Sequence, residues 1–89
     1  MRQIERAEKW LEKHPNDAAL LLALGRLCAR QSLWGKAQSY LEASVAVEPT
    51  YTGYYELARL EESTGNGEAA RRHYRRSLEL ALQTLDNKT

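Results

Sequence analysis

The feature that most constrains the fold is a self-similarity at an offset of 33 residues. At that offset Leu24-Gly25-Arg26-Leu27 aligns with Leu57-Ala58-Arg59-Leu60. The same offset pairs Ala37 with Ala70, Leu41 with Tyr74, Ser44 with Ser77 and Val47 with Leu80. A period of this length is typical of stacked repeats, in which each unit buries its apolar face against a neighbour. The sequence therefore predicts a stack of like units.

Composition makes the repeating unit helical. The 89 residues include 14 Leu and 12 Ala but only 2 Val and 1 Ile, and β-branched residues are the ones that sheets need. Pro15, Pro49 and the Gly65–Gly67 segment divide this single domain into five expected helices, with Asp17 and either Thr50 or Thr52 as N-caps. The expected ranges are 2–13, 18–31, 34–47, 53–63 and 68–85. Loops this short make consecutive helices antiparallel.

Each expected helix carries one apolar stripe, which predicts burial against its neighbours. The stripe of the third helix contains Trp34, Ala37, Leu41, Ser44 and Val45, and that of the fifth contains Ala70, Tyr74, Ser77, Leu78, Ala81 and Leu85. Gly25 and Ala58 lie at equivalent places within the second and fourth stripes. A small side chain there allows a partner helix to approach closely, which offsets the ~1 kcal/mol that glycine costs inside a helix.

Charge and cysteine content exclude several functions. Thirteen basic and twelve acidic side chains leave a net charge of +1, so no global field attracts nucleic acid or anionic lipid. The single cysteine, Cys28, excludes an intrachain disulfide and a four-cysteine zinc site. No apolar run approaches the roughly 18 residues that cross a bilayer. We therefore expect a soluble helical domain.

The spacings resemble the tetratricopeptide repeat (TPR) family, whose pattern is W-x2-L-G-x2-Y, A-x3-F and P. The positions that carry the resemblance are Leu24, Gly25, Ala37, Leu41 and Pro49 in the first copy, and Leu57, Ala58, Ala70 and Tyr74 in the second. The resemblance implies antiparallel helix pairs stacked in a right-handed superhelix. Its expected divisions are 1–15 as the second helix of a truncated repeat, 17–49 and 50–82 as full repeats, and 83–89 as C-terminal cap and tail. At the turn within the first repeat, Ser32 stands where the second has Gly65, so a left-handed conformation there is mildly strained.

The chain also resembles the C-terminal region of HemY-type proteins of the bacterial inner membrane. Trp10-Leu11-x2-His14-Pro15, Leu33-Trp34-x2-Ala37, Pro49-Thr50-Tyr51 and Leu80-Ala81-Leu82-Gln83 carry this resemblance. It implies a C-terminal segment of a longer, membrane-anchored protein at the cytoplasmic face, with late haem-pathway enzymes as partners. Contact with the membrane would come only through an anchor outside this fragment.

In TPR proteins the first helix of each pair lines a concave groove that binds protein or peptide partners. Carried onto this chain, the groove positions are Leu22, Arg26, Ala29 and Arg30, followed by Thr52, Tyr55, Arg59 and Glu62. TPR domains that clamp carboxylate tails use groove Asn and Lys residues. Because Ala23 and Glu56 stand where an Asn is expected, we do not predict that clamp. The function expected is a non-catalytic scaffold for protein–protein interaction.

Reactive groups do not converge in this register. Cys28 falls on an apolar stripe, where a thiol acts as a small hydrophobe. His14 is expected to be exposed, and neither His14 nor His73 has a metal-ligand partner four residues later. The sequence therefore predicts no enzyme, no metal and no cofactor.

Two hypotheses compete with the scaffold. The first is a haem or porphyrin carrier that uses His73, which the register points toward solvent, beside Tyr74. The second is a self-associating structural module.

The expected last helix also carries a cluster of four arginines, at positions 71, 72, 75 and 76. We interpret the cluster as a solvated helix face, with ion pairs from Glu68 to Arg72 and from Arg75 to Glu79. The alternative is that it docks on anionic lipid.

Overall fold

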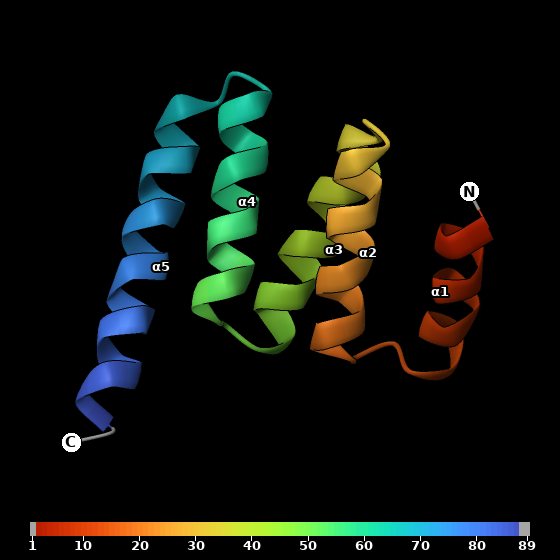
Figure 1. Cartoon of the computed structure of the whole chain (residues 1–89), viewed down its shortest axis with the longest axis horizontal. Coiled ribbons are helices and arrows are strands. Elements are labelled where there is room, and N and C mark those ends of the chain that lie inside the picture. Colours follow the sequence, from red (N-terminus) through yellow and green to blue (C-terminus); the bar gives the residue numbers. More distant parts are fainter. Residues whose placement is uncertain (1, 88–89) are drawn as a thin grey trace.

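The computed structural model describes residues 2–87 and contains, over that range, five helices and no strand. The helices are α1 (Arg2–Lys13), α2 (Ala18–Arg30), α3 (Trp34–Val47), α4 (Tyr51–Ser63) and α5 (Gly67–Asn87). Figure 1 shows α2 and α3 as one antiparallel pair and α4 and α5 as a second pair beside it, with α1 next to α2. The prediction of an all-helical chain is confirmed for the described residues. Met1 and the last two residues of the predicted tail, 88–89, lie outside them.

Helix boundaries follow the capping residues. Asp17 caps α2 as predicted, because its Oδ1 accepts a hydrogen bond from the Leu20 amide at 3.1 Å. Thr50 rather than Thr52 caps α4: its Oγ1 accepts from the Gly53 amide at 3.0 Å, so the helix begins two residues before the expected start. The expected ranges of the first and third helices agree with α1 and α3. The last helix continues to Asn87, so residues 83–87 of the expected cap and tail are helical.

The 33-residue offset is preserved in side-chain hydrogen bonds between paired helices. Ser44 Oγ on α3 donates to the Ala18 carbonyl at the start of α2, at 2.8 Å. Ser77 Oγ on α5 donates to the Tyr51 carbonyl at the start of α4, at 2.7 Å. Donor and acceptor both move by 33 residues from the first pair to the second, and both serines are buried. The two helix pairs are therefore joined in the same way.

The turns within the two pairs are equivalent as well. Ser32 has φ 60° and Gly65 has φ 85°, so each pair turns through one left-handed residue. The amide that follows reaches back to a carbonyl five residues earlier, from Leu33 to Cys28 at 2.8 Å and from Asn66 to Glu61 at 2.8 Å. This is the hydrogen-bond pattern of a Schellman helix end. Ser32 thus adopts the left-handed conformation in which mild strain is expected, because its Cβ is disfavoured there.

Close packing within the first pair depends on Gly25. A Cβ at this position would lie 2.5 Å from Leu41 Cδ2 and 3.3 Å from the Leu41 backbone nitrogen, so α2 and α3 touch where the glycine lies. Leu41 is only 1% exposed. Ala58, the counterpart of Gly25 on α4, is fully buried. The prediction that a small residue marks a close helix contact is confirmed at Gly25, and the expected burial is found at Ala58.

Three residues of the expected stripes are exposed. Trp34 is 43% exposed, and Leu78 and Leu85 are each 61% exposed. Ser77 already lies against the first residue of α4, so the turns of α5 that follow extend past the α4 helix (Figure 1). Leu78 and Leu85 consequently have no helix over them. Trp34 is the first residue of α3, and its side chain lines the surface pocket described below instead of packing in the core.

A carboxylate on α1 ties that helix to α3. Glu8 Oε2 accepts from Lys36 Nζ at 3.0 Å and also from the Tyr40 hydroxyl. These two hydrogen bonds hold the pKa of Glu8 below its ordinary value. Burial, with the Glu8 hydrogen bond and charge adding to it, raises the pKa of Tyr40 to about 12. The neutral phenol is thus the form that the folded protein favours.

Candidate functional site

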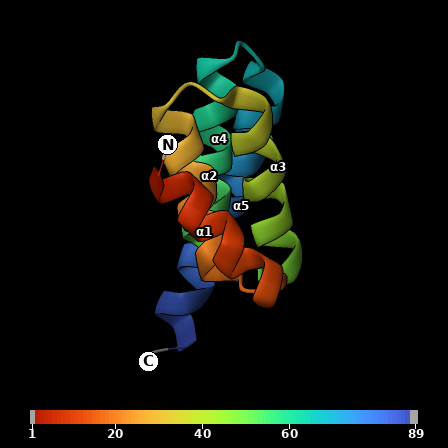
Figure 2. The same cartoon turned by 90° about the vertical axis from the view of Figure 1, so that its right-hand side faces the viewer.

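A pocket of about 310 Å³ opens on the face that α2 and α4 share. Figure 2 shows α2 and α4 on one side of the molecule and α3 on the other side. The lining residues come from both helix pairs and are Arg26, Ala29, Arg30, Trp34, Leu41, Glu56, Arg59, Leu60 and Ser63. Since the pocket depends on the two pairs lying together, neither pair forms it alone.

The basic end of the pocket is organised by one carboxylate. Arg26 Nε lies 2.7 Å from Glu56 Oε2, and an Arg59 terminal nitrogen lies 3.6 Å from Glu56 Oε1. The Glu56 side chain is 14% exposed, whereas those of Arg26 and Arg59 are 52% and 62% exposed. Arg30 has no ion pair within residues 2–87. Three guanidinium groups and one carboxylate leave this end of the pocket with a charge of +3 − 1 = +2.

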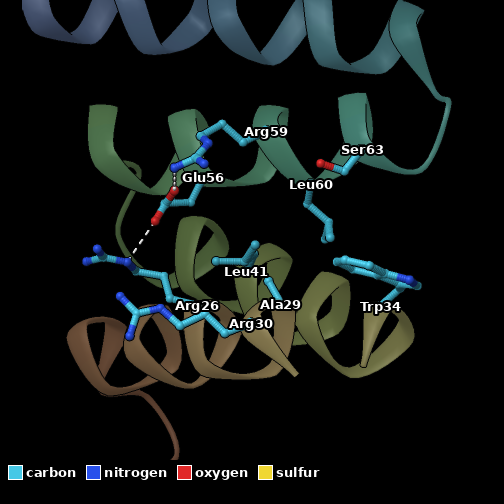
Figure 3. Close-up of a pocket in the computed structure, with 9 residues that line it drawn as sticks. All are labelled: Arg26, Ala29, Arg30, Trp34, Leu41, Glu56, Arg59, Leu60 and Ser63. Carbon is cyan, nitrogen blue, oxygen red and sulfur yellow. Dashed lines mark ion pairs between the residues drawn. The ribbon is translucent and has the colours of Figure 1, made fainter. Parts of the chain in front are cut away.

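The two ends of the pocket differ in chemistry. In Figure 3 the side chains of Arg26, Arg30 and Glu56 gather at one end, while Trp34 and Leu60 lie at the other, with Leu41 between them. The Trp34 ring is partly exposed and forms an apolar wall. An anion and an apolar group therefore find complementary surfaces in the same cavity.

The structure brings together part of the groove expected from the sequence. Arg26, Arg30 and Arg59 line the pocket, as does Ala29. Leu22, Tyr55, Glu62 and Thr52 do not line it. Leu22 is half-buried against the hydrophobic core.

Two of the residues that fall outside the pocket form a separate aromatic contact. Tyr55 packs edge to face on Tyr74 with ring centroids 5.8 Å apart, and Glu62 accepts from the Tyr74 hydroxyl at 2.9 Å. Tyr74, expected in the core, is accordingly half-buried with its hydroxyl bound to this surface carboxylate. Burial is also the first cause that raises the pKa of Tyr74, followed by the hydrogen bond to Glu62.

Sequence reasoning missed five pocket residues: Trp34, Leu41, Glu56, Leu60 and Ser63. Trp34 was assigned to the core because it opens an apolar stripe. Glu56 precedes Arg59 by three residues, which is a helical ion-pair spacing that indicates their contact. Its contact with Arg26, thirty residues earlier, depends on how the two pairs stack, and helical spacing does not indicate it.

His73 does not face solvent as the sequence predicted. Its Nδ1 lies 2.7 Å from Glu61 Oε1, and its ring stacks on Tyr54 with centroids 5.6 Å apart. Glu61, which replaces the thiol of Cys28 in the second pair, is buried, so a partner for its carboxylate is required. His73 is therefore held inside the α4–α5 contact by two neighbours, and this ring nitrogen is occupied.

The other reactive residues lie apart. Cys28 is fully buried, as expected, and burial raises the pKa of its thiol. His14 is exposed, as expected, and its ring stacks on Trp10. Within the described range no group of three or more His, Cys, Asp and Glu side chains is placed to hold a metal ion.

The outer surface of α5 combines arginines with uncovered leucines. All four arginines, 71, 72, 75 and 76, are exposed. Arg76, rather than the expected Arg75, approaches Glu79, at 3.6 Å, and the expected pair from Glu68 to Arg72 does not form. Leu78, Leu82 and Leu85 follow at helical spacing and are more than half exposed. No helix in residues 2–87 is both long enough and apolar enough to cross a membrane.

A scan of the chain against protein-family models gives no match, and a comparison with curated protein sequences gives none either. The functional conclusion therefore depends on the geometry of the site and of the repeating helix pairs.

Proposed function

We propose that this chain is a non-catalytic protein–protein interaction module of the TPR class. In this proposal α2–α3 and α4–α5 are two successive repeats of a right-handed superhelix, and α1 is the second helix of a preceding half-repeat. Two observations support it. The serine bonds of Ser44 and Ser77 and the left-handed turns at Ser32 and Gly65 recur at one offset of 33 residues.

The observation that carries the proposed function is the pocket shared by α2 and α4. Arg26 and Arg59 occupy the same slot in the two pairs and meet at one carboxylate, Glu56. A cavity of about 310 Å³ with partly exposed arginines and a tryptophan has the residue types that dominate binding energy at protein interfaces. The partner is a protein or peptide segment that enters between the first helices of the two pairs.

The resemblance to HemY-type proteins adds a cellular setting to the proposal. In that setting the chain is the C-terminal part of a membrane-anchored scaffold that gathers enzymes of late haem synthesis. The rival carrier hypothesis has less support in the structure, because His73 does not line the pocket and is half-buried, with its Nδ1 bonded to Glu61 and its ring stacked on Tyr54. We therefore favour the scaffold over a haem or porphyrin carrier.

A random peptide library displayed on phage tests the groove without assuming a partner. We expect selected peptides to lose binding to the double variant Arg26→Glu, Arg59→Glu. The matched control is Arg72→Glu, Arg75→Glu, which makes the same change in charge on the exposed surface of α5. Peptides that bind the wild type and the groove variant equally well contradict the proposal, as does a library that yields no binder.

A further inference from the structure

The basic end and the apolar end of the pocket lie a defined distance apart. On α4, Glu56 belongs to the basic end and Leu60 to the apolar end, four residues further on. Four residues of α-helix rise about 6 Å. In an extended chain, side chains two residues apart point the same way and lie about 6.6 Å apart. An extended peptide therefore reaches both ends with two side chains separated by one residue.

The basic end selects a carboxylate. A guanidinium group offers a planar fork of donors that matches a carboxylate, and the net charge of +2 attracts one. Arg30 has no ion pair within the described range, and Figure 3 shows its side chain extending beside that of Arg26. Arg26 and Arg59 are more than half exposed, so a ligand reaches them without unfolding the site.

The same arginines already hold an internal carboxylate. Glu56 is more buried than either arginine and lies between them, at 2.7 Å from Arg26 and 3.6 Å from Arg59. A peptide carboxylate entering the pocket would meet the negative charge of Glu56 and share the donors that Glu56 uses. The internal carboxylate therefore lowers the affinity of the site for an acidic ligand.

Resting on the proposed function, we infer that this pocket binds an extended peptide segment with a large apolar side chain and a carboxylate two residues apart, and that Glu56 competes with that carboxylate for Arg26 and Arg59. The apolar side chain lies against Trp34 and Leu60. The ligand carboxylate bonds Arg30 and the exposed sides of the other two arginines.

A peptide blocked at both ends provides the probe: acetyl-Gly-Leu-Gly-Glu-Gly-Leu-Gly-amide, which offers the spacing in either chain direction. Two control peptides replace the glutamate by glutamine or both leucines by serine. Binding is followed by titrating ¹⁵N-labelled protein and recording its two tryptophan indole signals. Trp34 lines the pocket and reports binding, while Trp10 is an exposed residue of α1 and serves as the internal control.

We expect the parent peptide to shift the Trp34 indole signal saturably and to leave the Trp10 signal in place. Loss of the leucines weakens binding by about fivefold or more, because the peptide then buries no apolar side chain against Trp34 and Leu60. Loss of the glutamate weakens binding by about fivefold, since an exposed ion pair is worth up to about that factor. Glu56→Gln tightens binding of the parent peptide by about fivefold for the same reason. The matched control, Glu68→Gln, removes an exposed carboxylate of α5 and leaves the affinity unchanged.

Three results overturn the inference. Equal affinity for the glutamate and glutamine peptides would show that the pocket does not recognise the carboxylate. Absence of a saturable Trp34 shift would show that the pocket does not bind this kind of peptide. Weaker binding by Glu56→Gln, with an unchanged thermal unfolding curve, makes Glu56 a positioning residue instead of a competitor. None of these outcomes contradicts the proposed function, which fails where the library yields no binder or where the selected peptides bind the wild type and the groove variant equally well.

Discussion

Substitution of Gly25 by alanine tests the close contact on which the first helix pair depends. An added Cβ would lie 2.5 Å from Leu41 Cδ2 and 2.6 Å from Leu41 Cγ, distances that side chains do not tolerate. Leu41 is 1% exposed, and its backbone nitrogen, which cannot move by side-chain rotation, would lie 3.3 Å from the new atom.

The magnitude follows from two opposing contributions. Alanine gains about 1 kcal/mol over glycine in helix propensity. Overpacking a filled core costs about 1–3 kcal/mol, and the two Leu41 contacts place this site at the upper end. We expect Gly25→Ala to lower the free energy of unfolding by about 1–2 kcal/mol, which lowers Tm by roughly 4–8 °C per kcal/mol in a domain of this size.

The assay is urea unfolding followed by far-UV circular dichroism. Gly35→Ala is the matched control, because it makes the same substitution inside a helix with no atom within 4 Å of the new Cβ. We expect that variant to gain up to about 1 kcal/mol. In a Leu41→Ala background the penalty at Gly25 should disappear, which a double-mutant cycle detects. If Gly25→Ala stabilises the protein as Gly35→Ala does, the close-contact argument is wrong.

Three further predictions concern single side chains. Ser44→Ala and Ser77→Ala should each lower the free energy of unfolding by about 1 kcal/mol and agree within about 0.5 kcal/mol, because both serines make the same bond in equivalent pairs; unequal losses in urea unfolding would contradict that equivalence. Ser32→Gly should raise stability by about 0.5–1 kcal/mol, since glycine adopts the left-handed conformation without a Cβ cost; an unchanged or lower urea midpoint would refute the strain. Because the pKa of Tyr40 is raised to about 12, stability should be complete below the ordinary tyrosine pKa of about 10 and fall as the pH rises toward 12. Tyr40→Phe should reduce that alkaline loss in unfolding measured from pH 9 to 12, and an identical loss would exclude Tyr40 as a source.

Periodicity predicted most of the fold because it reports which face of a helix is buried. The register placed Gly25 at a close helix contact, Ala58 in a buried stripe and Ser32 at the turn between two helices, and the structure agrees. It failed for Leu78 and Leu85, because an apolar stripe does not reveal that the helix continues past its partner. How far two paired helices overlap is a property of both segments and of the loop between them.

The candidate site was only partly predictable for a related reason. Arg26 and Arg59 share one repeat position, so the sequence placed them on the same surface. The meeting of both with Glu56, and the position of Trp34 at the end of the pocket, depend on how the second pair is set against the first. The orientation of the second pair depends on packing between α3 and α4. The apolar stripe of a single helix does not reveal that orientation. His73 was misplaced because its partner, Glu61, is a buried charge at a position that the first pair fills with a thiol.

The most direct test of the account is to map where a library-selected peptide touches ¹⁵N-labelled protein. The account predicts that the backbone amide shifts cluster on the turns of α2 and α4 that carry Arg26, Ala29, Arg59 and Ser63. Shifts that cluster instead on the exposed leucines of α5, at positions 78, 82 and 85, would contradict it and place the binding surface on the last helix.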